Sequence, residues 1–188
     1  MTQFKSEEEH NQPDSTTDSS NLRVPVVPDW KSHLIFWSVA VVGLGLDLWT
    51  KSAIFNWLEQ KPGNSFSVID GFLQLVRTFN PGAAFGIAAG RFYLLVIVSI
   101  IALVVILVVF LLSGSQRKLV HIALAFLTAG ICGNLYDRIF NNGFVRDFID
   151  VVYWPGRHWP AFNIADSLLC IGVVLLMISS FWAPSKRT

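Results

Sequence analysis

Phe92 to Leu112 reads FYLLVIVSIIALVVILVVFLL, and this apolar stretch decides the fold class of the chain. It carries no charged residue, and Ser99 is the one small polar side chain within it. An α-helix rises about 1.5 Å per residue, so these 21 residues would cover roughly 30 Å, the thickness of a bilayer's hydrocarbon core. The stretch therefore predicts a transmembrane helix.

The composition of the whole chain agrees with a small polytopic membrane protein. Its 188 residues have a mean hydropathy of +0.51, and only 14% of them are charged. The formal net charge is +1, and no cluster of Lys and Arg is interleaved with aromatic residues. A nucleic-acid partner is therefore not expected.

Three further hydrophobic segments, at about 33–54, 119–139 and 162–183, bring the expected number of transmembrane helices to four. Their polar residues all fall at the same end of the predicted bundle. The expected fold is a mostly α membrane protein, with a membrane domain over residues 31–188. Residues 1–30 are acidic and rich in Ser, Thr and Asn, which predicts a disordered N-terminal tail.

About 35 residues, 55–90, separate the first two predicted helices, which is too long for a simple connector. Hydrophobic residues alternate around Asp70-Gly71, a pattern typical of a β-hairpin. We therefore expect a small extracytoplasmic β-subdomain at the polar end of the bundle. The β-subdomain and the stretch Phe55 to Gln60, with Trp57 and Leu58, are interpreted as a lid and guide over the site.

Four transmembrane helices place both termini on one side of the membrane. The 14 Lys and Arg residues divide evenly between the two sides, so their number does not orient the chain. Their density does, because Arg117 and Lys118 lie in a very short connector, which favours a cytoplasmic location for that connector and for both termini.

Asp47 and Lys51 are four residues apart at the polar end of the first segment, a spacing that favours a salt bridge. The two residues could organise a site. Alternatively, they form a purely structural pair, or the Lys51 side chain extends to the membrane interface. Asn80 begins the turn Asn80-Pro81-Gly82, whose small residues allow close backbone approach.

The third segment ends with Asn134, Asp137 and Arg138, which share one helix face. Asp137 and Arg138 could compensate each other's charge, or Arg138 could bind a substrate carbonyl or a lipid phosphate. Gly130 and Gly133 in the same helix permit tight helix packing.

Asp147 and Asp166 are the candidate catalytic residues. Each lies at the edge of a membrane segment, where an unpaired charge is costly, and Asp166 follows Asn163 in the first turn of the fourth helix. Two close carboxylates tend to share one proton, so one can activate water while the other polarises a carbonyl group. The residues alone do not say which holds the proton. Asp150 is interpreted as a surface carboxylate.

Neither a metal ion nor a cofactor is expected. His10, His33, His121 and His158 are scattered without ligand spacing. Cys132 and Cys170 lie in apolar segments without a CxxC motif, and we interpret both as buried inert thiols.

Five motifs contain the polar candidate residues, and through them residues 33 to 183 of the chain resemble the lipoprotein signal peptidase family, signal peptidase II. The motifs are LDLWTK (46–51), FNPGAAFG (79–86), GNLYDRI (133–139), VRDFID (145–150) and FNIADS (162–167). Pro81 and Gly86 are not the residues that the resemblance leads us to expect in the second motif. This difference concerns the geometry of that loop and not the chemistry of the site.

The resemblance implies a membrane aspartyl endopeptidase near the outer face of the cytoplasmic membrane. Its substrates would be diacylglyceryl-modified bacterial prolipoproteins, cut just before the lipidated Cys, and globomycin-type antibiotics would bind between the two aspartates. Asp147 and Asp166 match the family's catalytic pair. The polar residues that surround this pair in the family are matched in this chain by Asp47, Lys51, Asn80, Asn134, Asp137, Arg138 and Asn163. Membrane lipids are expected partners, and we expect a monomer. A proton-coupled transporter and a Ser-Lys peptidase, with Lys51 activating Ser52 or Ser167, are the alternatives.

Overall fold

The computed structural model describes residues 27–83, 88–115 and 117–181 of the chain. Four helices dominate it: α1 (Trp30–Glu59), α2 (Phe92–Leu112), α3 (Lys118–Phe140) and α4 (Ile164–Phe181). All four are long and apolar enough to cross a membrane, which confirms the fold class predicted from the sequence. The predicted tail lies outside the described residues, apart from residues 27–29 and Trp30, the first residue of α1.

Helix α3 packs against each of the other three helices and is the most buried of the four. Its glycines explain the close approach of α4. A Cβ atom added at Gly130 would lie 2.7 Å from Cγ of Leu169, and Gly172 of α4 approaches Leu127 of α3 to a similar degree. Small residues at such contacts let the helix backbones come together where the hydrophobic effect cannot drive association.

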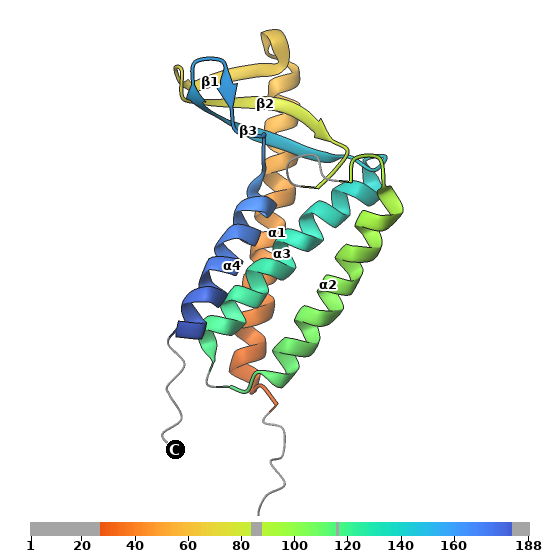
Figure 1. Ribbon diagram of the computed structural model, residues 1–188, viewed down its shortest axis with the longest axis vertical. Helices are drawn as coiled ribbons and strands as arrows, with labels where there is room; N and C mark the ends of the chain where they lie inside the picture. Colours follow the sequence, from red (N-terminus) through yellow and green to blue (C-terminus); the bar gives the residue numbers. More distant parts are fainter. Residues whose placement is uncertain (1–26, 84–87, 116, 182–188) are drawn as a thin grey trace, which may run out of the picture.

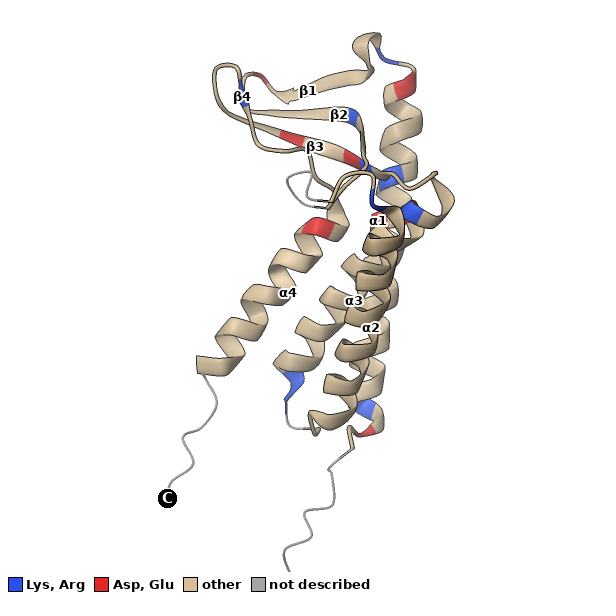
Figure 2. Ribbon diagram, turned by 45° about the vertical axis from the view of Figure 1, so that its right-hand side comes forward, with Lys and Arg blue, Asp and Glu red and all other residues tan. Residues whose placement is uncertain are grey.

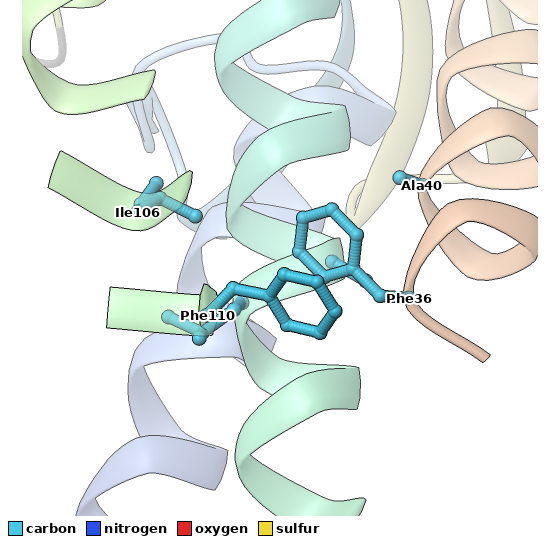
Figure 3. Packing of buried hydrophobic residues seen from close by; sticks show 6 residues of the cluster. Phe36, Ala40, Ile106 and Phe110 are labelled. Carbon is cyan, nitrogen blue, oxygen red and sulfur yellow. The ribbon is translucent and has the colours of Figure 1, made fainter. Parts of the chain in front are cut away.

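The end of the bundle where α1 begins and α4 ends is held by apolar contacts. Phe36 of α1 and Phe110 of α2 stack with their ring centroids 4.2 Å apart, and Figure 3 shows the two rings reaching toward each other beside α3. Ala40, Ile106, Leu124 and Ala125 complete this buried cluster. We call this region the aromatic end.

The opposite end carries an antiparallel sheet of strands β1 (Ser65–Ile69), β2 (Leu73–Asn80), β3 (Val145–Trp154) and β4 (Arg157–His158), in the order β1-β2-β3-β4. The β1-β2 hairpin lies where the sequence predicts it. Strands β3 and β4 were not predicted, because the stretch between Asp147 and Asp166 reads as a short aromatic connector that contains proline. The sheet therefore draws on the α1–α2 and α3–α4 connections and lies across the top of the bundle (Figure 1).

The lid interpretation of residues 55–60 does not fit the structure. These residues continue α1 to Glu59, beyond the predicted end near 54, and a short 3₁₀ turn (Pro62–Asn64) then leads into β1. Phe55 and Leu58 are buried, and the Phe55 ring lies edge-on to Phe79 of β2. The end of α1 therefore supports the sheet, and none of its residues lines the large cavity in the described part of the protein.

Charged residues gather at the two ends of the bundle, while the middle of the helices is free of them in the described part of the chain (Figure 2). The larger group lies between the helix ends and the sheet. We call it the polar end, and it contains every residue that the sequence analysis proposes for the site.

Candidate active site

The N-terminus of α4 is built around a reciprocal pair of hydrogen bonds. The Asn163 side-chain oxygen accepts a hydrogen bond from the Asp166 backbone N–H at 3.0 Å, and the Asp166 carboxylate accepts one from the Asn163 N–H at 3.2 Å. This arrangement is a capping box, which satisfies backbone donors that a helix start otherwise leaves unpaired. Asp166 is thus fixed in the first turn of α4, as predicted, and its half-buried side chain meets the positive end of the helix dipole.

Asp47 of α1 satisfies another donor of the same helix start. Its carboxylate accepts a hydrogen bond from the Ala165 N–H at 2.8 Å and forms a salt bridge with Lys51 at 2.7 Å. The salt bridge expected from the spacing of these two residues is therefore present. Gly133 of α3 leaves the space that this requires, because a Cβ atom there would collide with the Asp47 carboxylate.

Lys51 is the centre of the polar end, although its side chain is fully buried. Besides Asp47, its ammonium group lies 3.5 Å from the Asp137 carboxylate and donates a hydrogen bond to the Asn134 side-chain oxygen at 3.0 Å. A buried ammonium ion is stable only when it is paired and hydrogen-bonded. Lys51 thereby joins α1 to α3 and is linked to Asp166 through Asn134.

Asp137 does not pair with its neighbour Arg138, which was one of the interpretations of the sequence. Its carboxylate instead accepts hydrogen bonds from the Arg146 guanidinium group, the closest at 2.7 Å, and from the Arg146 backbone N–H at 2.9 Å. Arg146 is the residue that sequence reasoning missed. Its position beside Asp147 could have suggested a role, but only the fold brings β3 to the end of α3.

Arg138 and Asn80 hold the turn that follows β2. Arg138 donates a hydrogen bond to the Gly82 carbonyl oxygen at 2.9 Å, and the Asn80 side-chain oxygen accepts one from the Gly82 N–H at 2.9 Å. The rest of the expected motif, Ala84 to Gly86, lies outside the described residues. Arg138 thus binds this chain's own backbone, and its place in the cavity wall leaves a contact with substrate open.

Asp147 of β3 is almost completely buried and is held by two asparagine side chains. Asn163 donates a hydrogen bond to one carboxylate oxygen at 2.6 Å, and Asn80 donates to the other at 3.0 Å. Burial first, and then the charge of Asp166, raise the pKa of Asp147 from 3.8 to about 7. The hydrogen bonds from the two asparagines oppose that rise without cancelling it.

Asn134 links the two aspartates into one network. Its amide nitrogen donates a hydrogen bond to Asp166 at 2.8 Å, and its oxygen accepts one from the amide nitrogen of Asn163 at 3.1 Å. All nine candidate residues that the sequence analysis names therefore meet at the polar end. They come from helices α1, α3 and α4, from the residue that precedes α4, and from strands β2 and β3, so the site forms only when these elements are assembled.

A cavity of about 780 Å³ opens beside the two aspartates. Asp147, Asp166, Asn134 and Arg138 form its polar part. Apart from Asn80, Ser99 and Ser167, the remaining wall is apolar and is supplied by α2, with Leu95 and Val98 among others, by α4 and by the segment Trp159–Phe162. A polar group at the sheet and an apolar channel between membrane helices thus form one continuous space.

Three residues differ from their sequence-based interpretation. Asp150 is buried and bonded to His158 and Gln74, so it is no plain surface carboxylate. Cys132 is half-buried and Cys170 is exposed, so neither is the fully buried thiol that the sequence suggested. Within the described ranges, no group of three or more His, Cys, Asp or Glu side chains is placed to hold a metal ion.

Comparison with known proteins identifies the family. The family model for signal peptidase (SPase) II matches residues 39–182 of the chain. The chain belongs to the signal peptidase II family. It is accordingly a protease of the signal peptidase II type, an aspartic endopeptidase, and a multi-pass membrane protein.

Similar proteins include two curated relatives named lipoprotein signal peptidase. The relative from Geobacter sulfurreducens is 41% identical over 150 residues, which cover 78% of this chain and 91% of that protein. The relative from Rhodopirellula baltica is 35% identical over 166 residues, covering 79% of this chain and 72% of that protein. A solved bacterial membrane enzyme, determined by the in meso method at 2.3 Å resolution, is 35% identical with a TM-score of 0.72, and the match covers 88% of this chain and 96% of that one.

Proposed function

We propose that this protein removes signal peptides from diacylglyceryl-modified prolipoproteins, by cutting the peptide bond just before the lipidated Cys, with Asp147 and Asp166 as its catalytic residues. The observation that carries the proposal is that both carboxylates face one cavity whose other walls are apolar membrane helices. A signal peptide is an apolar helix within the bilayer, so its scissile peptide bond can reach such a site laterally from the membrane.

In the proposed reaction, Asp147 holds the proton that the pair shares, because its pKa lies near 7 and Asp166 sits at the positive end of α4. Asp166 takes a proton from water as the water oxygen attacks the peptide carbonyl carbon. Asp147 gives its proton to the carbonyl oxygen, which forms a tetrahedral diol. Asp166 then passes its proton to the leaving nitrogen while one diol hydroxyl returns its proton to Asp147, and the C–N bond breaks.

The charges of the polar end agree with one shared proton. Three cationic side chains meet four carboxylates there, and a single proton on the pair leaves the cluster neutral, which a site of low dielectric constant favours. The cations are Lys51, Arg138 and Arg146, and the carboxylates are Asp47, Asp137, Asp147 and Asp166.

The other site residues act by positioning. Asn163 and Asn80 orient Asp147, Asn134 orients Asp166, and Asp47 with Lys51 anchors the start of α4. The Arg138 guanidinium group lies next to the cavity and can also contact the carbonyl group of the substrate. None of these steps requires a metal ion or a cofactor.

The apolar part of the cavity fits the lipid chains and the signal helix of such a substrate. The proposal places the polar end at the outer face of the cytoplasmic membrane and both termini in the cytoplasm, with membrane lipids around a monomer. The helix ends Trp30 and Phe181 and the α2–α3 turn, which precedes Lys118, lie together at the aromatic end, which supports that orientation. Globomycin-type inhibitors are expected to bind between the aspartates.

The geometry disfavours the two alternatives. A Ser-Lys peptidase needs a lysine beside its serine, whereas the Lys51 ammonium group contacts Asp47, Asp137 and Asn134. Ser52 is bonded instead to Arg146. A proton conduit needs polar groups through the depth of the bundle, and the described charged residues lie at its ends.

The test is cleavage of a synthetic diacylglyceryl-prolipoprotein by the purified protein and its Asp147→Asn and Asp166→Asn variants. We expect both variants to fold and to lose at least about three orders of magnitude in rate, because each removes one half of the acid-base pair. The Asp70→Asn variant, whose exposed carboxylate accepts a hydrogen bond from Ser67, is the matched control and should retain full activity. Substantial turnover by either dyad variant contradicts the assignment.

A further inference from the structure

A second acidic site lies in the sheet, apart from the catalytic pair. The Asp150 carboxylate of β3 is within 2.8 Å of the His158 ring nitrogen Nδ1 and accepts a hydrogen bond from the Gln74 side chain of β2 at 2.7 Å. The Asp150 side chain is only 10% exposed, whereas that of His158 is 46% exposed. Three strands are thus tied together by side chains at one place, and the proposed mechanism makes no use of it.

The site lies on the reverse side of the cavity wall. Side chains along a strand alternate between faces, so Asp150, three residues after Asp147, projects from the opposite face of β3. His158 does not line the cavity, whereas the next four residues, Trp159 to Phe162, all do. Asp150 and His158 therefore hold the wall segment from behind.

The wall segment itself has few backbone bonds to the sheet. Strand β4 has only two residues, and Pro160 has no N–H group to donate. The Trp159 N–H donates to the Val151 carbonyl oxygen at 2.8 Å, Phe162 exchanges bonds with Ile149 at 2.9 and 3.0 Å, and the Phe162 carbonyl oxygen also accepts one from the Phe148 N–H at 3.1 Å. These bonds lie at the two ends of the segment. The next residue, Asn163, caps α4, so a shift of the wall segment would also move the helix turn that carries Asp166.

We propose that the Asp150–His158 pair, together with Gln74, positions the Trp159–Phe162 wall of the cavity and thereby sets the affinity for substrate. These are positioning residues, since none of them reaches the two catalytic carboxylates. The role in substrate affinity rests on the proposed function. The role in fixing the position of the Trp159–Phe162 segment is independent of that function and can be measured separately.

The first measurement is hydrogen exchange of the full-length protein in detergent micelles, without substrate. Asp150→Asn keeps an acceptor for Gln74 but loses the charge that pairs with His158, and His158→Ala removes the partner from the exposed side. We expect the backbone N–H groups of Trp159 and Phe162 to exchange about tenfold faster in both variants, since local opening becomes easier. Asp70→Asn, the same change elsewhere in the sheet, should leave them unchanged. Equal exchange in all four proteins overturns the proposal, whatever the substrate is.

The second measurement is the kinetics of cleavage of a diacylglyceryl-prolipoprotein peptide. We expect KM to rise about fivefold in each single variant with kcat within about a factor of two, because only the wall, and not the acid-base pair, is disturbed. The double variant should resemble the single variants, since the two residues act as one pair. His158→Gln, which keeps a hydrogen-bond donor, should recover part of the affinity.

The outcomes separate the two proposals. Fully additive effects, a loss confined to kcat, or an unchanged KM overturn the role in substrate affinity. If Asp150→Asn is unstable, the half-exposed His158 variants give the same answers. A wild-type protein that cleaves no lipidated peptide contradicts the proposed function, and the exchange experiment still decides whether the pair holds the wall.

Discussion

The two ends of the helix bundle are held together by opposite kinds of contact. At the aromatic end, Phe36 and Phe110 stack against small and aliphatic side chains, and the packing depends on shape. At the polar end, Lys51 and its partners form a buried network in which each group depends on the others for its charge or its hydrogen bonds. Packing can relax after a conservative change, whereas a buried network that loses one member leaves an unpaired charge.

The largest predicted effect comes from replacing the centre of the network. Lys51→Met keeps the length and much of the volume of the side chain but leaves Asp47 and Asp137 without their shared cation. We expect the protein to lose about 3–5 kcal/mol in free energy of unfolding, and cleavage to fall at least about a thousandfold, since Asp47 no longer fixes the start of α4. Thermal unfolding in detergent and the peptide cleavage assay measure the two quantities.

Phe36→Leu is the matched change at the aromatic end. Leu retains an apolar side chain, and lipid tails are as apolar as the bundle interior, so only packing is lost. We expect about 1 kcal/mol of destabilisation and cleavage close to that of the wild type. If Lys51→Met and Phe36→Leu lost similar amounts of cleavage activity, the polar network would be no more sensitive to substitution than the apolar packing at the aromatic end.

A second, smaller effect is expected from pH and would show which aspartate carries the proton. Because the pKa of Asp147 is raised from 3.8 to about 7, the folded state binds more protons than the unfolded state between these values. The free energy of unfolding should therefore fall by about 1 kcal/mol per pH unit as pH rises from about 4 to about 7, and then level off. Asp147→Asn should remove this decline.

The rate of cleavage should follow the same group. The reaction needs one proton on the pair, so kcat of the wild-type protein should fall above about pH 7, by up to tenfold per unit. A decline in stability that persists in Asp147→Asn would assign the titration to another residue and place the shared proton elsewhere.

The sequence predicted the parts of the molecule whose signal is local. The four apolar segments, the 65–80 hairpin and the Asp47–Lys51 pair each depend on residues that are near one another in the chain, and all are present. The five spaced motifs then led to the family. Arg146 was missed and Asp150 was misread because strands β3 and β4 were not predicted: Asp137 meets Arg146 across the turn from α3 into β3, and Asp150 meets His158 across the β3–β4 hairpin. An aromatic connector gives little hint of strand pairing when the other strand lies some 70 residues away.

A last comparison, between two glycines in the membrane helices, separates packing at the polar end from packing elsewhere. A Cβ atom at Gly133 of α3 would collide with the Asp47 carboxylate, whereas one at Gly45 of α1 would meet no atom within 4 Å. Gly133→Ala should therefore displace Asp47 from the Ala165 N–H and lower cleavage about tenfold, at a cost of about 1–2 kcal/mol in stability. Gly45→Ala should raise stability slightly, since Ala favours the helix by about 0.5–1 kcal/mol, and leave cleavage unchanged. If both changes act alike, the close approach at Gly133 matters for helix packing alone, and the link from Asp47 to the start of α4 does not control the reactive geometry.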